Sequence, residues 1–234
     1  MSRDQLVTDW VASRFPNQSV EITPASADAS FRRYFRLTWP EGGTRILMDA
    51  PPDKEDCKPF IHVAGLLAKA GLAAPHVVDQ DLVNGFLVLT DLGRIGYLDA
   101  LNADLSLADT LMRPVLDVLV KWQLSSRAST LPPYDATLLR RELDLFPEWF
   151  VGRHLGYELS GDEKVMLDRI FRFLINSALN QPKVFTHRDF MPRNLMVVES
   201  EATLTPGIID FQDAVYGPIA YDVVSLFRDA FISW

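Results

Sequence analysis

Two short apolar runs late in the chain, at 195–198 and 206–209, limit its possible folds more than any other feature. Asn194 comes directly before the first run and Asp210 directly after the second, with seven mostly polar residues between the runs. This pattern predicts an antiparallel hairpin. Because paired antiparallel strands bring opposite residues together, we expect the side chains of Asn194 and Asp210 to lie within a few ångströms of each other.

The predicted hairpin end has the chemistry of a magnesium site. Asn194 and Asp210 supply one neutral and one charged oxygen, and Mg²⁺ prefers a few such ligands together with water and substrate phosphates. Asp189, in the loop that leads into the hairpin, is placed to accept a proton from an attacking hydroxyl or to orient it. His187 is better suited to packing beneath that loop. The alternative is an ordinary polar surface loop.

Composition excludes several classes of protein. The 234 residues carry a formal charge of −8, which argues against binding to nucleic acid. The start of the chain does not resemble a signal peptide, and no apolar run reaches the ~18 residues that span a bilayer. Cys57 is the single cysteine, as expected in a reducing compartment. We therefore expect a cytoplasmic protein that binds neither membrane nor nucleic acid; its oligomeric state is left open.

Residues 1–91 have the pattern of a small antiparallel-sheet lobe with one helix packed on the sheet. Polar residues alternate with β-branched and aromatic ones, and Gly42-Gly43 and Asn84-Gly85 mark two hairpin turns. A helix is predicted from about 55 to 70, and Ser2 is a candidate cap for a short first helix. These features predict an N-terminal lobe.

Residues 92–234 are predicted to form a larger, mainly helical lobe. Candidate helix caps occur at Ser106, Asp135 and Ser160, and a last helix is expected from about Asp222. The fold class is therefore α+β with two lobes, and the hinge is expected near 90–94.

The motifs resemble those of a known family. "HRDFMPRN" with "IIDF" resembles the catalytic loop and metal-binding aspartate of protein-kinase-like phosphotransferases. The phrase "GPIAYDVVSL" is similar to the aminoglycoside phosphotransferase and choline kinase group. Within it, "DASFRRYFRL", "MDAPP", "LTDLG" and "LFPEWF" resemble bacterial kinases that use ATP to phosphorylate the anomeric C1 hydroxyl of N-acetylmuramate and N-acetylglucosamine in peptidoglycan recycling.

The resemblance implies a role for each matching residue. Asp189 matches the catalytic base, and Asn194 and Asp210 match the Mg²⁺ ligands. Asp222 matches an aspartate that braces the catalytic loop, with a simple helix cap as the alternative. The fold implied is a two-lobed protein-kinase-like fold that binds ATP and Mg²⁺.

The phosphate-binding part departs from the protein-kinase pattern. No glycine-rich loop is present, and "ASADASFRR" occupies its position, so Ser26, Asp28 and Ser30 are the candidate phosphate contacts. Met48 stands where the kinase lysine is expected, and the following helix lacks a central glutamate. Another cation must then balance the triphosphate. The candidates are Arg32, Arg33 and Arg193; the first two face opposite ways on a strand, and we favour Arg33.

The nucleotide base and the acceptor also have candidate contacts. Adenine is expected against backbone groups from Leu89 to Asp91, for which an ordinary edge strand is the alternative. In "RELDLFPEWF", Glu142 and Glu148 are candidates for sugar hydroxyls, and Trp149 for stacking on a pyranose ring. The alternative is a buried tryptophan with solvated glutamates.

Three other functions stay open. The first is a kinase whose acceptor is an aminoglycoside or an amino alcohol. The second is a nucleotide-binding regulator without catalysis, and the third is a metal-dependent hydrolase. Resembling kinases continue past "LFRDAFISW" with helices that complete the acceptor pocket, so a truncated C-terminal lobe is also an expectation.

Overall fold

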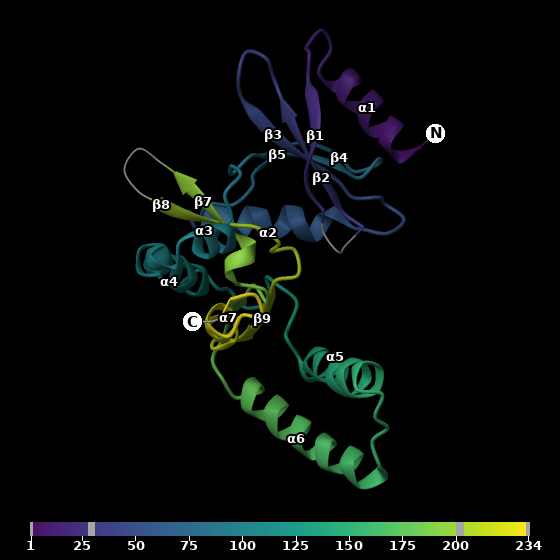
Figure 1. Cartoon of the computed structure of the whole chain (residues 1–234), viewed down its shortest axis with the longest axis vertical. Helices are drawn as coiled ribbons and strands as arrows, with labels where there is room; N and C mark the ends of the chain where they lie inside the picture. The colour runs from purple at the N-terminus through teal and green to yellow at the C-terminus, as the bar shows by residue number, and fades with distance from the viewer. Residues whose placement is uncertain (1, 28–30, 200–203, 233–234) are drawn as a thin grey trace. The chain divides into compact units, whose positions relative to one another are not determined.

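The computed structural model describes residues 2–27, 31–199 and 204–232. The chain forms two compact units, Met1–Val118 with Pro192–Asp213, and Leu119–Met191 with Ala214–Trp234 (Figure 1). This division differs from the boundary at residue 91 expected from the sequence, because the late hairpin belongs to the first unit.

A five-stranded antiparallel sheet forms the centre of the first unit, with strand order β1-β2-β3-β5-β4. The strands are β1 (Glu21–Ala27), β2 (Arg33–Thr38), β3 (Thr44–Asp49), β4 (Val77–Asp81) and β5 (Phe86–Thr90). Gly42 and Gly85, both at positive φ, lie in the β2–β3 and β4–β5 turns, so both hairpins predicted from the sequence are confirmed.

Helix α1 (Arg3–Arg14) covers one face of this sheet. Val7 and Val11 pack there against Leu37 and Leu47, all at most 2% exposed. Ser2 caps the helix by accepting a hydrogen bond from the Gln5 N–H, as predicted. Helix α2 (Cys57–Lys69) follows β3, and its cap is the Asp56 side chain.

The hairpin of β7 (Leu195–Glu199) and β8 (Leu204–Ile208) joins the first unit through backbone hydrogen bonds. The Val197 N–H donates to Ile95 O at 2.8 Å, and the Ile208 N–H donates to Ala73 O at 2.8 Å. These long-range bonds explain why the hairpin groups with the sheet rather than with the helices that surround it in sequence.

Between the sheet and this hairpin the chain is helical, with α3 (Tyr97–Ala103), η1 (Leu105–Leu107) and α4 (Ala108–Leu124). The cap predicted at Ser106 was wrong. Asp104 caps the η1 turn instead, since its carboxylate accepts from both the N–H and the hydroxyl of Ser106. A second short turn, η3 (Pro192–Asn194), leads directly into β7.

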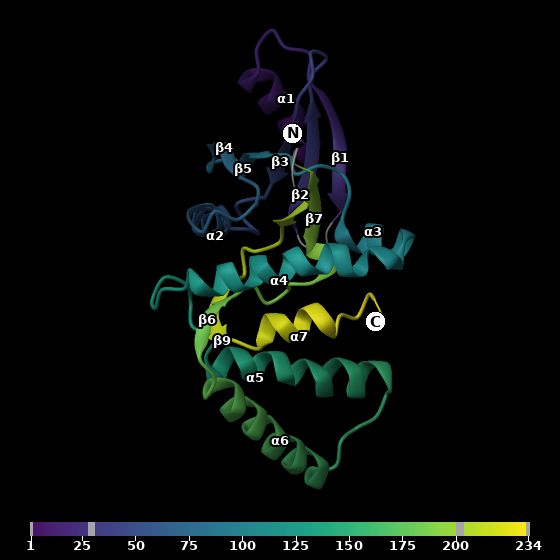
Figure 2. The same ribbon diagram turned by 90° about the vertical axis from the view of Figure 1, so that its left-hand side faces the viewer.

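The second unit is mainly helical. It contains α5 (Ala136–Leu145), η2 (Phe146–His154), α6 (Gly161–Leu179) and α7 (Tyr221–Phe227), with a two-stranded ladder of β6 (Lys183–Thr186) and β9 (Val215–Pro218). Figure 2 shows α5 and α6 converging at one end, where the two helices pack together. The caps predicted at Asp135 and Ser160 are confirmed, and Ser160 forms a full capping box with Glu163.

The core of the second unit lies between α5, α6 and the ladder. Its buried members are Tyr134, Leu139, Ile175 and Val215. Among the described residues, none of the helices is both long and apolar enough to span a bilayer.

Candidate active site

The β7–β8 hairpin brings Asn194 and Asp210 together. Leu195 pairs with Ile208, and the Ile209 N–H donates to Asn194 O at 3.1 Å, so the ladder continues to the residue beside Asp210. Asn194 is 7% exposed, and Asp210 has a positive φ of 61°, a conformation that turns the chain sharply as it leaves the strand. Both residues line the same cavity.

That cavity has a volume of about 480 Å³ and lies wholly within the first unit. Its walls come from three parts of the chain: the sheet, the segment after β5, and the ends of the hairpin. The residues that line it include Tyr34, Arg36, Ile46, Leu89, Thr90, Asp91, Leu92, Gly93, Arg193, Asn194 and Asp210.

The oxygen donors in the cavity suit a hard divalent cation. Asp210 supplies a carboxylate, with one oxygen accepting a 2.8 Å hydrogen bond from Gln212 Nε2, and Asn194 supplies an amide oxygen. In the part of the chain that the structure describes, no three His, Cys, Asp or Glu side chains cluster to form a closed metal site. Two protein ligands with open positions fit Mg²⁺, which keeps water or phosphate oxygens as its remaining ligands.

The end of β5 supplies another wall of the cavity. Leu89, Thr90 and Asp91, the residues expected to meet adenine, all line it. The Thr90 N–H donates to His76 O at 2.9 Å, and this hydrogen bond fixes the end of β5. The backbone that follows Thr90 continues along this wall, since Asp91, Leu92 and Gly93 also line the cavity.

A buried ion pair lies in the same wall, and sequence reasoning missed it. Arg36 Nε donates to Asp91 Oδ2 at 2.6 Å, and Arg36 Nη2 donates to Asp91 Oδ1 at 3.0 Å and to Gly93 O at 2.7 Å. The Arg36 hydrogen bonds hold the pKa of Asp91 below its usual value, although burial acts in the opposite direction. The available signal was strand alternation, because Arg36 shares a sheet face with Tyr34.

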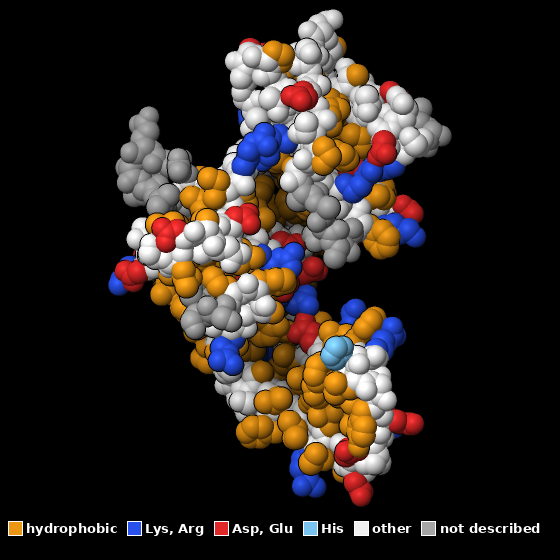
Figure 3. All heavy atoms as spheres, viewed as in Figure 1, with side chains coloured by type: hydrophobic (Ala, Val, Ile, Leu, Met, Phe, Trp, Pro, Cys, Tyr) orange, Lys and Arg blue, Asp and Glu red, His pale blue; other side chains and the backbone are white. Residues whose placement is uncertain are grey.

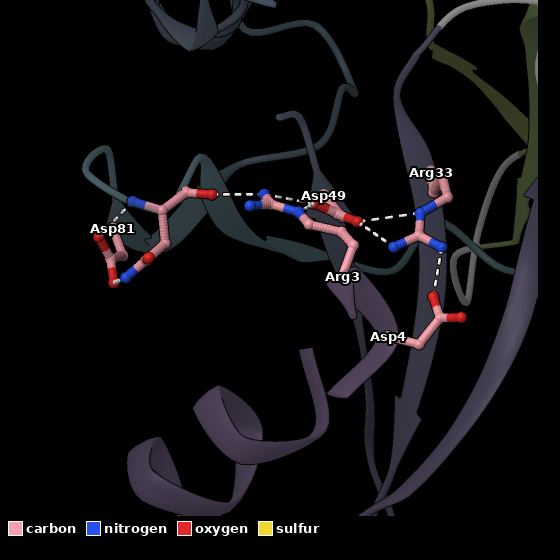
Figure 4. A network of polar contacts seen from close by, with 6 residues as sticks. Arg3, Asp4, Arg33, Asp49 and Asp81 are labelled. Carbon is pink, nitrogen blue, oxygen red and sulfur yellow. Dashed lines mark hydrogen bonds and ion pairs between the residues drawn. The ribbon is translucent and has the colours of Figure 1, made fainter. Parts of the chain in front are cut away.

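Arg33, favoured in the sequence as the cation for the triphosphate, does not line this cavity. Its side chain lies on the α1 face of the sheet, where Nη2 donates to Asp49 Oδ2 at 2.6 Å and Nη1 binds Asp4 (Figure 4). Arg3 from α1 binds the same Asp49 carboxylate. Arg32 lies at the opposite strand parity and forms an ion pair with Glu55 at 2.8 Å. Neither arginine lines the cavity, and the geometry gives no support to the preference for Arg33, since Arg33 binds Asp4 and Asp49.

The other phosphate contacts expected from the sequence are Ser26, Asp28 and Ser30. Ser26 pairs through its backbone with Tyr34 in the β1–β2 ladder. Asp28 and Ser30 lie outside the described residues. Met48 is fully buried in β3, so no charge occupies the position of the kinase lysine.

Asp189 belongs to the second unit, on a loop held by Asp222. One Asp222 oxygen accepts the His187 N–H at 2.7 Å, and the other accepts the Arg188 N–H at 3.0 Å. Arg188 has a positive φ of 80°, a strained conformation that these bonds stabilise. Burial raises the pKa of Asp222 to about 7. Asp222 thus shapes the loop that presents the exposed Asp189.

Glu142 also contacts this loop. Its carboxylate receives Arg188 Nη2 at 2.5 Å, the Tyr221 hydroxyl at 3.3 Å and the Tyr134 hydroxyl. Burial and the hydrogen bond to Glu142 raise the pKa of Tyr134. The structure therefore gives Glu142 three protein partners, and its contact with sugar hydroxyls stays a prediction.

Glu148 and Trp149 lie on η2, which presents them to the surface. The Trp149 side chain is half-exposed, contrary to the alternative of a buried tryptophan, and the Arg153 guanidinium lies 3.9 Å from its ring centroid. Glu148 forms a 3.3 Å ion pair with the same arginine. Figure 3 shows hydrophobic side chains gathered over this part of the chain, around α5 and α6. Arg153 thus contacts both the Trp149 ring and the Glu148 carboxylate.

Comparison with known proteins agrees with this geometry. Residues 21–234 match the model of the phosphotransferase enzyme family. An N-acetylmuramate/N-acetylglucosamine kinase of Pseudomonas aeruginosa is 51% identical over 245 residues, covering 100% of this chain and 70% of the relative. The Pseudomonas putida enzyme of the same name is 52% identical over 214 residues, covering 91% of this chain and 61% of the relative. The chain thus spans about 60–70% of the length of these relatives.

A solved structure supports the fold. The ADP-bound crystal structure of aminoglycoside phosphotransferase APH(2'')-Ib superposes with a TM-score of 0.66 at 16% identity, covering 97% of this chain and 77% of that one. The predicted α+β, kinase-like fold is confirmed. On the strength of the family match over residues 21–234, the chain belongs to the phosphotransferase enzyme family.

Proposed function

We propose that this chain is an ATP-dependent kinase that transfers the γ-phosphoryl group to the anomeric C1 hydroxyl of N-acetylmuramate or N-acetylglucosamine, a step of peptidoglycan recycling. The observation that supports it most is identity of 51% across the whole chain to a kinase named for those two sugars. A cytoplasmic location is part of the proposal, because the reaction consumes ATP.

In this proposal the 480 Å³ cavity receives the nucleotide. Backbone groups after Leu89 meet the base, and Arg193, which lines the cavity beside Asn194, balances phosphate charge in place of the missing lysine. Asn194 and Asp210 hold Mg²⁺. When bound, the ion would neutralise charge on the phosphates, which is the largest electrostatic requirement of phosphoryl transfer.

We assign Asp189 the role of accepting the proton from, or orienting, the sugar hydroxyl. Its loop is preorganised by two Asp222 hydrogen bonds and by the Arg188–Glu142 ion pair, so the carboxylate needs little rearrangement before transfer. Glu142 is then a positioning residue. Glu148 and Trp149 stay candidates for contact with the sugar.

The test is a product assay. The protein is incubated with Mg·ATP and N-acetylmuramate, and the product is examined for an acid-labile sugar 1-phosphate. Parallel reactions contain N-acetylglucosamine, kanamycin or choline as the acceptor. The proposal predicts phosphorylation of the two amino sugars and loss of product on chelation of the metal. Phosphorylation of kanamycin or choline alone would identify a different acceptor class, and ATP binding without any turnover would identify a regulator.

A further inference from the structure

We propose that Arg36 is a positioning residue for the nucleotide: it holds the backbone of residues 91–93 in the form that receives the base. The inference rests on the proposed function, because it takes the cavity of the first unit as the nucleotide site. Arg36 lies in "DASFRRYFRL" and its partners Asp91 and Gly93 lie in "LTDLG", two of the motifs that carry the family resemblance, but the resemblance assigns Arg36 no role.

The register of the sheet shows how far this side chain reaches. Arg36 on β2 pairs with Ile46 on β3, and Ile46 pairs with Leu89 on β5. The guanidinium therefore crosses the width of β3 to meet Asp91 and Gly93, which follow β5 in sequence. It does so on the face of the sheet that lines the cavity, together with Ile46 and Leu89.

The backbone it holds lies beyond the last strand pairing. The β3–β5 ladder ends with Arg45 opposite Thr90, and strand pairing resumes only with the Gly96–Met196 bridge, so residues 91–93 lie between the two. Gly93 has a φ of 104°, a conformation that few other residues adopt, and its N–H donates to Asp91 Oδ1 at 2.9 Å. Arg36 binds both ends of this short turn, the Asp91 carboxylate and the Gly93 carbonyl. The Arg36 side chain thus supplies hydrogen bonds to this turn that a paired strand would otherwise supply.

The chemistry of the pair explains why arginine is required. The side chains of Arg36 and Asp91 are only 8% and 6% exposed, so each charge depends on the other. The planar fork of arginine donates to the two carboxylate oxygens and to Gly93 O at once. Lysine keeps the charge but has no planar fork, so it cannot reproduce this pattern.

The sheet offers a matched control on its other face (Figure 4). Arg3 also binds one carboxylate and one backbone carbonyl, those of Asp49 and Asn84. Asp49 is fully buried, as Asp91 nearly is. Arg3 does not line the cavity, however, and its partners anchor α1. Arg3→Lys therefore removes the same kind of arginine fork without touching the cavity wall, although Asp49 keeps Arg33 as a second partner.

The experiment compares Arg36→Lys with Arg3→Lys. The Kd for Mg·ATP is measured by calorimetry, kcat and KM by turnover of N-acetylmuramate, and stability by urea unfolding. We expect both variants to lose stability, whereas only Arg36→Lys raises the Kd and KM for ATP. If the turn adopts its bound form a tenth of the time, the apparent Kd rises roughly tenfold. The value of kcat at saturating ATP should change much less.

A double variant keeps the inference testable if Arg36→Lys does not fold. Arg36→Met with Asp91→Asn removes both buried charges, a replacement that proteins often tolerate. It still lacks the bond to Gly93 O, so the loss of ATP affinity should persist. The inference is overturned if either Arg36 variant binds ATP like the unmodified protein, or if Arg3→Lys weakens ATP binding equally. Failure of the unmodified protein to bind ATP would refute the proposed function instead.

Discussion

Asp189 stands apart from its neighbours at the scale of single residues, because it is exposed while His187 and Phe190 are buried. Its backbone is fixed by two hydrogen bonds, since the Asp189 N–H donates to His187 Nδ1 at 3.3 Å and Asp189 O accepts from the Met191 N–H. Asp189→Asn should keep this geometry and remove the proton acceptor. We expect kcat to fall by about 10²–10⁴, with the Kd for Mg·ATP unchanged. Turnover assays and calorimetry together check this, and unchanged kcat would remove Asp189 from the reaction.

Asp222 should make stability depend on pH. Burial raises its pKa from 3.8 to about 7, so between these values the folded chain keeps a proton that the unfolded chain has released. The stability that Asp222 contributes is therefore fully present below about pH 4 and is lost as the pH rises to about 7. Asp222→Asn does not titrate there.

The measurement is urea unfolding of both proteins at several pH values. The unfolding free energy of the unmodified protein, minus that of Asp222→Asn, should decrease as the pH rises, by at most about 1.4 kcal/mol per pH unit. Groups with lowered pKa values, such as Asp91, contribute equally to both proteins and cancel. A difference that stays constant from pH 4 to 7 would show that Asp222 is ionised throughout.

Asp210 is predicted to determine the requirement for metal. Asp210→Ala removes the charged one of the two proposed metal ligands. Mg·ATP should then no longer raise the melting temperature of the protein, and sugar phosphorylation should be lost. Asp213→Ala is the matched control, because Asp213 is exposed and does not line the cavity. Normal turnover in Asp210→Ala would reject the metal assignment.

At the scale of elements, the turns at Gly42 and Gly85 are expected to differ in how strongly they affect the stability of the sheet. A Cβ on Gly85 would lie 1.9 Å from Ala50 O, and Gly85 O itself accepts the Ala50 N–H at 2.8 Å. Gly85→Ala must therefore open the β4–β5 turn. Gly42 has a similar positive φ with nothing within 4 Å of a Cβ. We expect Gly42→Ala to cost about 1 kcal/mol and Gly85→Ala at least about 3 kcal/mol, as measured by urea unfolding. Equal losses would mean that strain in φ alone decides.

Elements with strong local signals could be predicted from the sequence. Ser2, Asp135 and Ser160 were identified as caps because a side chain and a backbone N–H three residues away suffice to form one. Asp104 was missed because it caps a single η1 turn rather than the longer helix after it. Strand β9 was missed because it is only four residues long and pairs with β6, about 30 residues earlier in the chain.

Site residues divide in the same way. Asn194 and Asp210 could be placed together, because local hairpin register determines their meeting. The face on which Arg33 lies could not be predicted, since alternation says that Arg32 and Arg33 face opposite ways but not which face α1 covers. Arg36 was missed because its partners, Asp91 and Gly93, lie more than fifty residues away. Long-range pairing leaves no pattern in a single sequence.

The whole molecule divides its chemistry between two compact units. The first, Met1–Val118 with Pro192–Asp213, contains every residue that lines the 480 Å³ cavity, including the two proposed metal ligands. The second, Leu119–Met191 with Ala214–Trp234, contains Asp189, its brace Asp222, and the exposed η2 surface. Under the proposed function, the residues assigned to nucleotide binding and those assigned to acceptor chemistry thus belong to different units.

This division predicts where a nucleotide should slow amide hydrogen exchange. A ligand stabilises the unit that binds it, by about 2.7 kcal/mol at a hundred times its Kd. With Mg·ATP and no sugar, added protection should therefore concentrate in the first unit, at the end of β5 and along β7–β8, while α5 and α6 exchange as before. Mass spectrometry of peptides from both units, with Asp210→Ala as the control, measures this. Protection confined to α5 and α6 would place the nucleotide in the wrong unit and contradict the assignment of the cavity.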